Sequence, residues 1–419
     1  MNLRKKIFFI VNFLKTRNVI KEYCKEIISY MHLGCNNDKQ LEHILLWASE
    51  NVEFYKNRNL NKLTDFPVVN KSIIKENEAL FISKKYNKAD LHKTRTSGSE
   101  GIPFVAYQDE GKKLRNLADT IVFSEMAGYE IGTKLYYLRA WTDFNRKTKL
   151  TSFFQNFVLV DSVKLSDENI KNFLNKLEKD KKRKSILAYA SSLVAICKCI
   201  TKKNIRVSSK IDAIISGSEY LPEDVKQTLK VLFKTNVVSR YSNCENGMLA
   251  QQTIDGDDFI INTASYHIEI LDVNTDEPVR DGEMGRIVVT DLYNRAMPFI
   301  RYDTGDIGVK RGNVLEKVFG RNVDFLTATS GELISPYAVV NFMQGCSDIK
   351  QFQLVQEGKS IYVMKLVYNG DEKYPNENNI LTALKEFFGD DAQICIEYVD
   401  EIPNLSSGKY RYVVNKSKA

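Results

Sequence analysis

The sequence predicts an α/β fold, with a large N-terminal domain and a small α+β C-terminal domain. Three observations predict it: a strand–helix–strand unit in the middle of the chain, a β-rich stretch after that unit, and a compact group of strands and one helix near the C-terminus. The large domain should combine parallel-rich sheets and helices with a β-rich part. We place the boundary at Gly320–Arg321, which gives domains of residues 1–320 and 321–419.

Residues 1–90 are expected to be mainly helical. Their clearest apolar face has helical spacing and consists of Leu41, Ile44, Leu45 and Ala48. The first residues, MNLRKKIFFIVNFLKTRN, combine a basic start with a short apolar run that Asn12, Lys15 and Arg17 interrupt. A secretory signal needs a longer apolar core and a small-residue cleavage site. This segment therefore favours a helix that packs on the core, with a membrane-surface helix as the alternative.

The strand–helix–strand unit is the clearest local pattern. Residues 211–216 form a buried-strand pattern that stops at the polar cluster Ser216–Glu219, and a helix follows with Pro222 near its first position. Residues 236–242 supply the second strand. Strands joined in this way are parallel and end at one edge of the sheet, where ligands bind in open α/β folds. We therefore expect Ser216–Glu219 and Tyr241–Glu245 to face one crevice.

The rest of the large domain is predicted to be β-rich, and the small domain is predicted to combine strands with a helix. Strand patterns in the large domain cover residues 267–273, 286–292 and 298–308. In the small domain, strand patterns cover residues 351–358, 360–369 and 392–399, and a helical pattern covers residues 378–389.

Composition limits the function classes. A net charge of +7 with Lys and Arg interleaved among 53 acidic residues argues against a nucleic-acid binder, which would carry a clustered basic stripe. The densest basic run, Lys179–Lys184, is typical of a solvated helix end. The seven cysteines are scattered without a C-x-x-C pair, so we expect free thiols, a reducing compartment and no structural zinc. No apolar run approaches the roughly 18–20 residues of a transmembrane segment, and the sequence predicts a cytoplasmic protein.

Three motifs in the large domain carry candidate chemistry. The small and hydroxyl-bearing residues of Thr96–Pro103 would let backbone N–H groups approach phosphate oxygens, although the lysine of a Walker loop is absent. Glu245, at the second strand end, could hold Mg²⁺ against phosphates. Asp306, in the predicted turn Arg301–Asp306, could accept both hydroxyls of a ribose. Each motif alone also fits an ordinary surface turn or helix cap.

Two further motifs follow. Gly320–Asp324 lies at the expected domain boundary, and Ser406–Arg411 carries Lys409 on a glycine-hinged loop. A mobile lysine is suited to negative charge that develops in a transition state, whereas read alone it is a solvated chain end. The order and spacing of all five motifs carry the functional argument.

Taken together, the five motifs resemble the adenylate-forming superfamily of acyl-CoA synthetases, nonribosomal-peptide adenylation domains and luciferases. The compact branch of phenylacetate-CoA ligases and capsular-polysaccharide adenylyltransferases is the most similar, and residues 187–200 (LAYASSLVAICKCI) also resemble that branch. The resemblance runs from about residue 60 to the C-terminus. It implies ATP- and Mg²⁺-dependent activation of a carboxylic acid to an acyl-adenylate with release of pyrophosphate. Transfer to coenzyme A or to an amine would follow, with a role in surface-polysaccharide biosynthesis as one context.

The resemblance also implies roles for individual residues. The β- and γ-phosphates of ATP would be bound by Thr96, Ser97, Gly98, Ser99 and Gly101. The adenine would lie along Ser216, Gly217, Ser218 and Glu219, with Tyr241 stacked on it. Glu245 would bind Mg²⁺ and count with Lys409 as catalytic, Asp306 would hold the ribose, and Arg321 would contact ribose or phosphate at the hinge. The small domain would be a mobile lid that brings Lys409 to the substrate carboxylate and the α-phosphate.

Several points stay open at this stage. The acid pocket is expected among aromatic and small residues that could equally be core: Tyr136, Trp141, Tyr189 and Ser191. Glu100 and Val323 depart from the family pattern, and they motivate a second reading, a degenerate homologue that binds nucleotide or a partner without turnover. A peripheral membrane scaffold is a third reading. The choice between coenzyme A and an amine, and the existence of a homodimer, are left open.

Overall fold

The structure is a computed structural model that describes residues 3–56, 62–95, 104–141, 146–162, 165–321, 325–334, 336–346, 349–368, 370, 373–403 and 411–417. The chain forms two compact units. The N-terminal unit comprises residues 1–304 and 308–318, and the C-terminal unit comprises residues 305–307 and 319–419. The division after Val318 lies close to the expected boundary at Gly320–Arg321.

The N-terminal unit opens with helices, as predicted. These are α1 (Leu3–Thr16), α2 (Val19–Leu33), α3 (Asp38–Asn51), α4 (Lys71–Glu76) and α5 (Glu78–Phe81). The side chains of Asn37 and Asn70 accept hydrogen bonds from the first turns of α3 and α4, which fixes where these helices begin. A short hairpin, β1 (His92–Arg95) and β2 (Val105–Gln108), then leads into the long helix α6 (Glu110–Met126).

The sheet with the most strands in the described structure is mixed and has eleven of them. In order across the sheet, its strands are β10 (Tyr266–Leu271), β11 (Met284–Asp291), β12 (Tyr302–Arg311), β13 (Val314–Arg321), β9 (Phe259–Ile261), β8 (Gly247–Gln252), β7 (Asn236–Asn243), β6 (Ala213–Gly217), β5 (Lys184–Tyr189), β3 (Lys134–Arg139) and β4 (Phe157–Asp161). Strands β3 to β7 run parallel, whereas β8 and β9 pair antiparallel. The predicted α/β class is confirmed.

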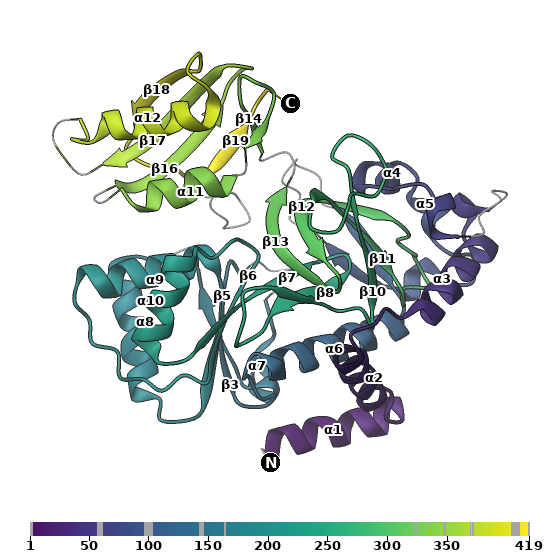
Figure 1. Ribbon diagram of the computed structural model, residues 1–419. Coiled ribbons are helices and arrows are strands. Elements are labelled where there is room, and N and C mark those ends of the chain that lie inside the picture. Colours follow the sequence, from purple (N-terminus) through teal and green to yellow (C-terminus); the bar gives the residue numbers. More distant parts are fainter. Residues whose placement is uncertain are drawn as a thin grey trace. The chain divides into compact units, whose positions relative to one another are not determined.

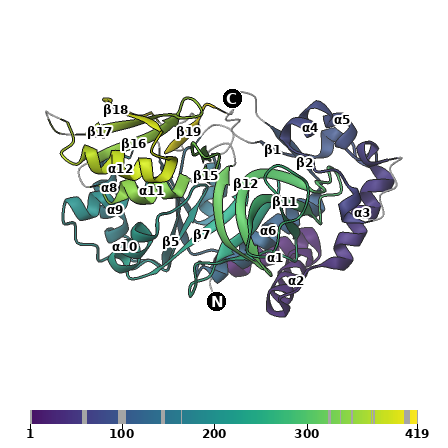
Figure 2. The ribbon, with the colours of Figure 1, turned by 45° about the horizontal axis from the view of Figure 1, so that its top comes forward.

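The predicted strand–helix–strand unit is confirmed by β6, α10 (Glu223–Phe233) and β7. Helices α8 (Asp167–Lys179), α9 (Ala190–Lys202) and α10 cover one face of the parallel strands (Figure 1). Adjacent residues of β6 show the two faces: Ile214 packs with these helices, and Ile215 packs on the opposite side with Ala127, at the end of α6. Both ribbon views show α3, α4 and α5 together at the other end of the sheet, where they share a core with the segment before β12 (Figures 1 and 2).

Two local expectations were met only in part. The strand expected over residues 298–308 is confirmed from Tyr302 onwards by the long strand β12, but the turn expected at Arg301–Asp306 is wrong, because Gly305, with a φ of 78°, lies within that strand. Glycine accepts that left-handed backbone without steric cost, so a glycine-containing motif need not end a strand. Helix α1 was expected to pack on the core; Phe8 does so, whereas Leu3, Ile7, Ile10 and Leu14 form an exposed apolar stripe.

The C-terminal unit has its own four-stranded sheet, in the order β18 (Gln393–Tyr398), β17 (Ile361–Tyr368), β16 (Ile349–Gln356), β19 (Val413–Asn415). The remaining elements are β14 (Leu326–Thr327), β15 (Leu333–Ile334), α11 (Pro336–Gln344) and α12 (Glu377–Phe388). The fully buried Ile380, Leu384 and Phe388 place the predicted apolar face of α12 in a core with the sheet. The α+β character predicted for this part of the chain is confirmed.

Candidate active site at the carboxyl edge of the parallel strands

The two polar clusters lie at the same edge of the sheet, because β6 and β7 are parallel neighbours. Gly217, the last residue of β6, is in register with Arg240 of β7, so Tyr241 is the first β7 residue beyond the end of β6. Ser216 is fully buried, and its hydroxyl has no hydrogen-bond partner within the described part of the chain. Ser218 adopts a left-handed backbone with a φ of 71°, which turns the chain sharply after the strand.

Glu219 links this strand end to a neighbouring helix. Its Oε2 accepts a hydrogen bond from the backbone N–H of Ser191 at 2.9 Å, in the first turn of α9. A carboxylate is stabilised at that position by the positive end of the helix dipole. Glu219 therefore holds the β6 end and the start of α9 together at the edge where ligands bind in such sheets.

Tyr241 is largely buried, with 8% of its surface exposed. Its ring belongs to the core cluster formed by β8 to β11, and its hydroxyl donates to Thr304 Oγ1 at 3.4 Å. A register shift between Tyr241 and Ser242 distorts β7 at this point. The resemblance assigns Tyr241 to adenine stacking; the structure adds that its ring packs with apolar neighbours.

Glu245 lies in the tight turn between β7 and β8 and is 2% exposed. Its Oε1 is 3.1 Å from Lys71 Nζ, at the start of α4, and accepts a hydrogen bond from the Tyr302 hydroxyl at 2.7 Å. Tyr302 reaches it because a parallel bridge joins Val69 to the beginning of β12. Sequence analysis did not select Lys71 or Tyr302, and both lie far from Glu245 in the chain.

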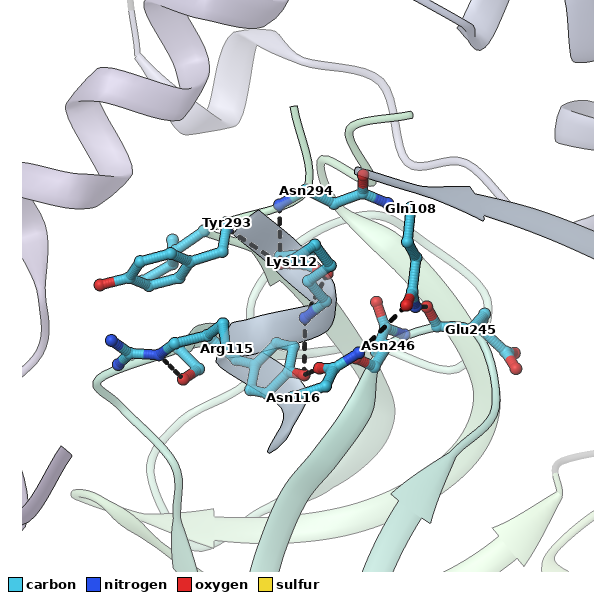
Figure 3. Close-up of polar contacts among 12 residues, drawn as sticks. Gln108, Lys112, Arg115, Asn116, Glu245, Asn246, Tyr293 and Asn294 are labelled. Atoms are coloured by element: carbon cyan, nitrogen blue, oxygen red, sulfur yellow. Dashed lines mark hydrogen bonds and ion pairs between the residues drawn. The ribbon is translucent and has the colours of Figure 1, made fainter. Parts of the chain in front are cut away.

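Buried polar residues hold the Glu245 turn in place. Gln108 Nε2 donates to the Glu245 carbonyl at 3.0 Å, and Tyr266 OH donates to the Asn246 carbonyl at 2.6 Å. Lys112 Nζ donates to Tyr266 OH at 2.9 Å, so helix α6 supports the turn from behind (Figure 3). The Glu245 carboxylate points away from this network (Figure 3). These hydrogen bonds fix the backbone of the turn, which therefore holds the Glu245 carboxylate in a defined position.

The side-chain amide of Asn246 takes no part in this hydrogen-bond network. The residue is fully buried, and neither its Nδ2 nor its Oδ1 has a hydrogen-bond partner among the residues that the structure describes. A buried amide without partners is costly, and such groups often mark functional sites. Together with Glu245, it supplies the oxygen-donor chemistry that suits a hard divalent cation.

The residues expected in the acid pocket divide into two sets. Tyr136 is 1% exposed, lies in the core between β3 and α8, and donates from its hydroxyl to Asp180 Oδ2 at 3.0 Å, which agrees with the core alternative. Trp141, by contrast, follows the end of β3 and donates from Nε1 to the Val160 carbonyl at 2.9 Å. Tyr189 ends β5 next to Ser191, and burial raises the pKa of its hydroxyl. These last residues lie at the carboxyl edge.

Arg139 is a further cation at this edge that sequence analysis did not select. It ends β3, its guanidinium lies 5.4 Å from the Trp141 ring centroid, and its Nη1 donates to Tyr137 OH at 3.3 Å. Its Nε is buried and without a hydrogen-bond partner among the described residues. A strand-end arginine was visible in the sequence, but only the parallel register brings it near Tyr189.

Some predicted site residues cannot be placed. Thr96–Gly101 and Lys409 lie outside the described residues, as do Glu100 and Val323. Arg321 ends β13, but its side chain is outside the described part of the chain. Asp306 lies within β12, in the short stretch that groups with the C-terminal unit. No group of three or more His, Cys, Asp or Glu side chains positioned to hold a metal ion occurs in the described ranges.

Comparisons with known proteins bear on the fold of the chain. Residues 326–416 match the CapK C-terminal domain family. Over 444 aligned residues the chain is 25% identical to Protein CapK of Staphylococcus aureus, covering 97% of this chain and 95% of that protein. The crystal structure of 2-hydroxyisobutyryl-CoA ligase in the postadenylation state with R3-HIB-AMP superposes with a TM-score of 0.69 at 15% identity, covering 91% of this chain and 89% of the ligase.

ATP-bound MatB from Rhodopseudomonas palustris superposes with a TM-score of 0.57 at 14% identity, over 78% of this chain and 68% of MatB. The chain has the fold of an adenylate-forming ligase. The predicted resemblance to that superfamily is therefore confirmed, and the similarity to Protein CapK fits its capsular branch. In an open α/β sheet, the edge at which Ser216 and the Glu245 turn lie is the usual place for a ligand.

Proposed function

We propose that this protein activates a carboxylic acid with ATP to form an acyl-adenylate and pyrophosphate, and then transfers the acyl group to coenzyme A or to an amine. The observation that carries the proposal is Glu245, a buried carboxylate held rigidly at the carboxyl edge of an adenylate-forming ligase fold. Among the described residues, the contacts found for this carboxylate, from Lys71 and Tyr302, both fall on Oε1, so Oε2 is the oxygen that we assign to a metal ion.

The residues at this edge fit a magnesium ion that arrives with ATP. Glu245 offers a carboxylate and Asn246 a buried amide that is unpartnered in the described structure, and Mg²⁺ typically takes one or two such ligands plus phosphate oxygens. When bound, the ion would neutralise charge on the phosphates. The chain itself would supply further positive charge from Lys71, next to Glu245, and from Lys409 in the C-terminal unit.

The reaction follows from charge. A carboxylate oxygen of the acid attacks the α-phosphorus, the new bond is a mixed anhydride, and the bond to pyrophosphate breaks. Both reactants are anions, so positive groups are needed where charge accumulates. Lys409 would approach from a mobile C-terminal unit and withdraw before the acceptor attacks the acyl carbon, which separates the two half-reactions.

The acid itself would lie near Trp141, Tyr189 and Arg139. The buried Arg139 Nε favours an acid with a second anionic or hydrogen-bonding group over a plain hydrocarbon chain. A role in surface-polysaccharide biosynthesis would fit the similarity to Protein CapK, with an amino sugar as one amine acceptor. The alternative is a degenerate homologue that binds nucleotide without turnover.

The test is acid-dependent release of pyrophosphate from ATP and Mg²⁺, with hydroxylamine to trap the adenylate. The acid panel should include aryl, fatty, amino, hydroxy and dicarboxylic acids. We expect release with one class of acid, and a loss of about 100-fold or more in Lys409→Ala and in Glu245→Gln. Lys416→Ala is the matched control, because Lys416 lies in the same C-terminal segment but pairs only with the exposed Glu357 in the described structure.

The outcomes separate the two functions. Tight ATP binding without release on any acid would favour the degenerate homologue, and absence of ATP binding would overturn both. Replacing hydroxylamine by coenzyme A or by an amino sugar then identifies the acceptor, since one gives a thioester and the other an amide.

A further inference from the structure

Helix α1 presents its apolar stripe to solvent. Leu3, Ile7, Ile10 and Leu14 recur at the spacing of one helix face, and they are 70%, 45%, 58% and 76% exposed. A surface helix of a globular protein normally shows the opposite arrangement, with its apolar face against the core. Phe13, on the flank of the stripe, is also 53% exposed.

The inward side of α1 combines one apolar contact, Phe8 against the core shared by α2 and α6, with two polar ones. Lys5 pairs with Glu125 of α6 at 2.6 Å, and the Arg4 guanidinium lies 5.1 Å from the ring centroid of Phe153 while donating to the Phe153 carbonyl. These contacts orient α1 so that the apolar stripe faces away from the body of the N-terminal unit. They also join α1 to α7 (Lys149–Gln155).

Helix α7 extends the same surface. Leu150, Phe153 and Phe154 share one face of this helix and are 68%, 65% and 63% exposed. The Arg4–Phe153 contact joins the two helices, and we call their exposed apolar side chains together the α1–α7 surface. Large apolar patches of this kind mark sites of interaction with a protein or a membrane.

The charged side chains that α1, α7 and the residues next to α7 contribute are all positive, and Glu125 of α6 is already paired with Lys5. Residues 3–17 and 146–159 contain no Asp or Glu. Exposed cations border the apolar side chains at Lys6, Arg17, Arg146, Lys147 and Lys149. In a symmetric dimer the same patch would meet itself, and these like charges would be brought together. An anionic surface complements both properties, since it offers an apolar layer behind negative head groups.

An open depression of about 470 Å³ adjoins α7. Its lining combines the cations Arg146, Lys147 and Lys149 with apolar side chains such as Phe153 and Phe157. The Ser152 hydroxyl there is buried and lacks a hydrogen-bond partner among the described residues. Cations next to apolar side chains suit a phosphate-bearing lipid head group and the start of its acyl chains.

We propose that the α1–α7 surface docks this protein onto a membrane that contains anionic lipids. Helix α1 would lie in the plane of the interface, with Leu3, Ile7, Ile10 and Leu14 in the acyl boundary and the basic residues at the head groups. No helix in the described part of the chain is long and apolar enough to cross a bilayer. Docking of this kind needs no spanning segment and is independent of the adenylation proposed above.

Co-sedimentation of the full chain with vesicles tests the proposal. Vesicles of phosphatidylcholine with about one-third phosphatidylglycerol should pellet the protein, and vesicles of phosphatidylcholine alone should not. The double variant Ile10→Asp/Leu14→Asp should lower the partition coefficient by at least about tenfold, since burial of each side chain is worth more than about 1 kcal/mol. Lys147→Glu/Lys149→Glu should lower it about as much, as should high salt.

Val231→Asp is the matched control, because Val231 is 75% exposed on α10 and lies outside this surface. All variants change exposed side chains, so each should unfold at the wild-type temperature and keep its acid-dependent pyrophosphate release. Equal binding to both kinds of vesicle, or unchanged binding by the Ile10/Leu14 variant, would overturn the proposal. A protein that does not bind vesicles, but is dimeric and becomes monomeric in that variant, would show instead an interface between two copies.

Discussion

At the residue scale, Lys71 is the most informative neighbour of Glu245. Its ammonium group already occupies one side of the buried carboxylate, at 3.1 Å from Oε1, while its own side chain is 46% exposed. A cation at that oxygen competes with any metal ion for the same negative charge. Lys71 therefore sets how much Mg²⁺ the site requires, provided that Glu245 is a metal ligand.

We expect Lys71→Ala to lower the Mg²⁺ concentration for half-maximal pyrophosphate release by roughly threefold. That change corresponds to about 0.6 kcal/mol, within the range for ion pairs with an exposed partner. The measurement is a Mg²⁺ titration at saturating ATP, with Lys75→Ala as control, since Lys75 is exposed on the same short helix. A curve for Lys71→Ala that coincides with that of Lys75→Ala would show that Lys71 does not compete with the metal.

Sequence predicts site residues from local patterns, and not from proximity that only the fold creates. Ser216 and Glu245 could be found because a buried strand followed by polar residues is a local pattern. Lys71 could not, because it meets Glu245 only in the folded chain, and Arg139, although it ends a strand, comes close to Tyr189 only through the register of β3 with β5. Glu219 was found, but its bond to the backbone of Ser191 depends on where α9 starts.

At the element scale, helix α6 is notable for the charges that it buries. Lys112 and Arg115 are both fully buried, and Lys112 Nζ lies 2.7 Å from the equally buried Asp291 of β11. Arg115 donates to Ser265 Oγ at 2.7 Å and to Glu26 of α2 at 2.9 Å. Helix α6 is thus attached to the sheet and to α2 by polar contacts, as well as by its apolar side chains.

Removing one partner of such a pair leaves an uncompensated buried charge. We expect Lys112→Met to lower the free energy of unfolding of the N-terminal unit by about 3–5 kcal/mol. Lys113→Met, at the exposed neighbouring position, should change it by less than about 0.5 kcal/mol. Urea unfolding measures both. Adding Asp291→Asn to Lys112→Met should recover part of the lost free energy of unfolding, because it removes the uncompensated charge. If the double variant is no more stable than Lys112→Met, the destabilisation comes from lost packing and not from the buried charge.

The sequence predicted which segments form helices and strands, but it did not predict what each helix or strand packs against. The apolar pattern of residues 211–216 and the turn residues after it were enough to predict β6, α10 and β7. The stripe on α1 was equally clear, but periodicity shows only that a stripe exists and not what it faces. The sequence also did not predict that Lys112 and Arg115 are buried, because a charged residue in a helix is usually exposed to solvent.

At the scale of the whole molecule, the two units offer separate stability measurements. The chain has two tryptophans, Trp47 and Trp141, and both belong to the N-terminal unit. Each donates from its indole to a backbone carbonyl, of Arg295 and of Val160 respectively. Tryptophan fluorescence therefore reports unfolding of the N-terminal unit alone, even where the chain as a whole does not unfold in one step.

That signal can test a pH dependence that originates at His267, in β10. Burial, reinforced by nearby Lys310, lowers the pKa of His267 to about 4 from an ordinary value of 6.5. The unfolded chain therefore takes up a proton before the folded chain does as the pH falls. The contribution of His267 to the free energy of unfolding is therefore fully present above pH 6.5. It is lost as the pH falls from 6.5 to about 4, by at most about 1.4 kcal/mol per pH unit.

We expect the urea midpoint of tryptophan fluorescence to fall more steeply between pH 6.5 and 4.5 in the wild type than in His267→Gln. Carboxylates also titrate in this window, so the difference between the two proteins isolates the histidine. His43→Gln, at an exposed histidine on α3, should follow the wild type. Parallel curves for wild type and His267→Gln would mean that the folded unit lets His267 take up its proton as readily as the unfolded chain, by opening β10 to water.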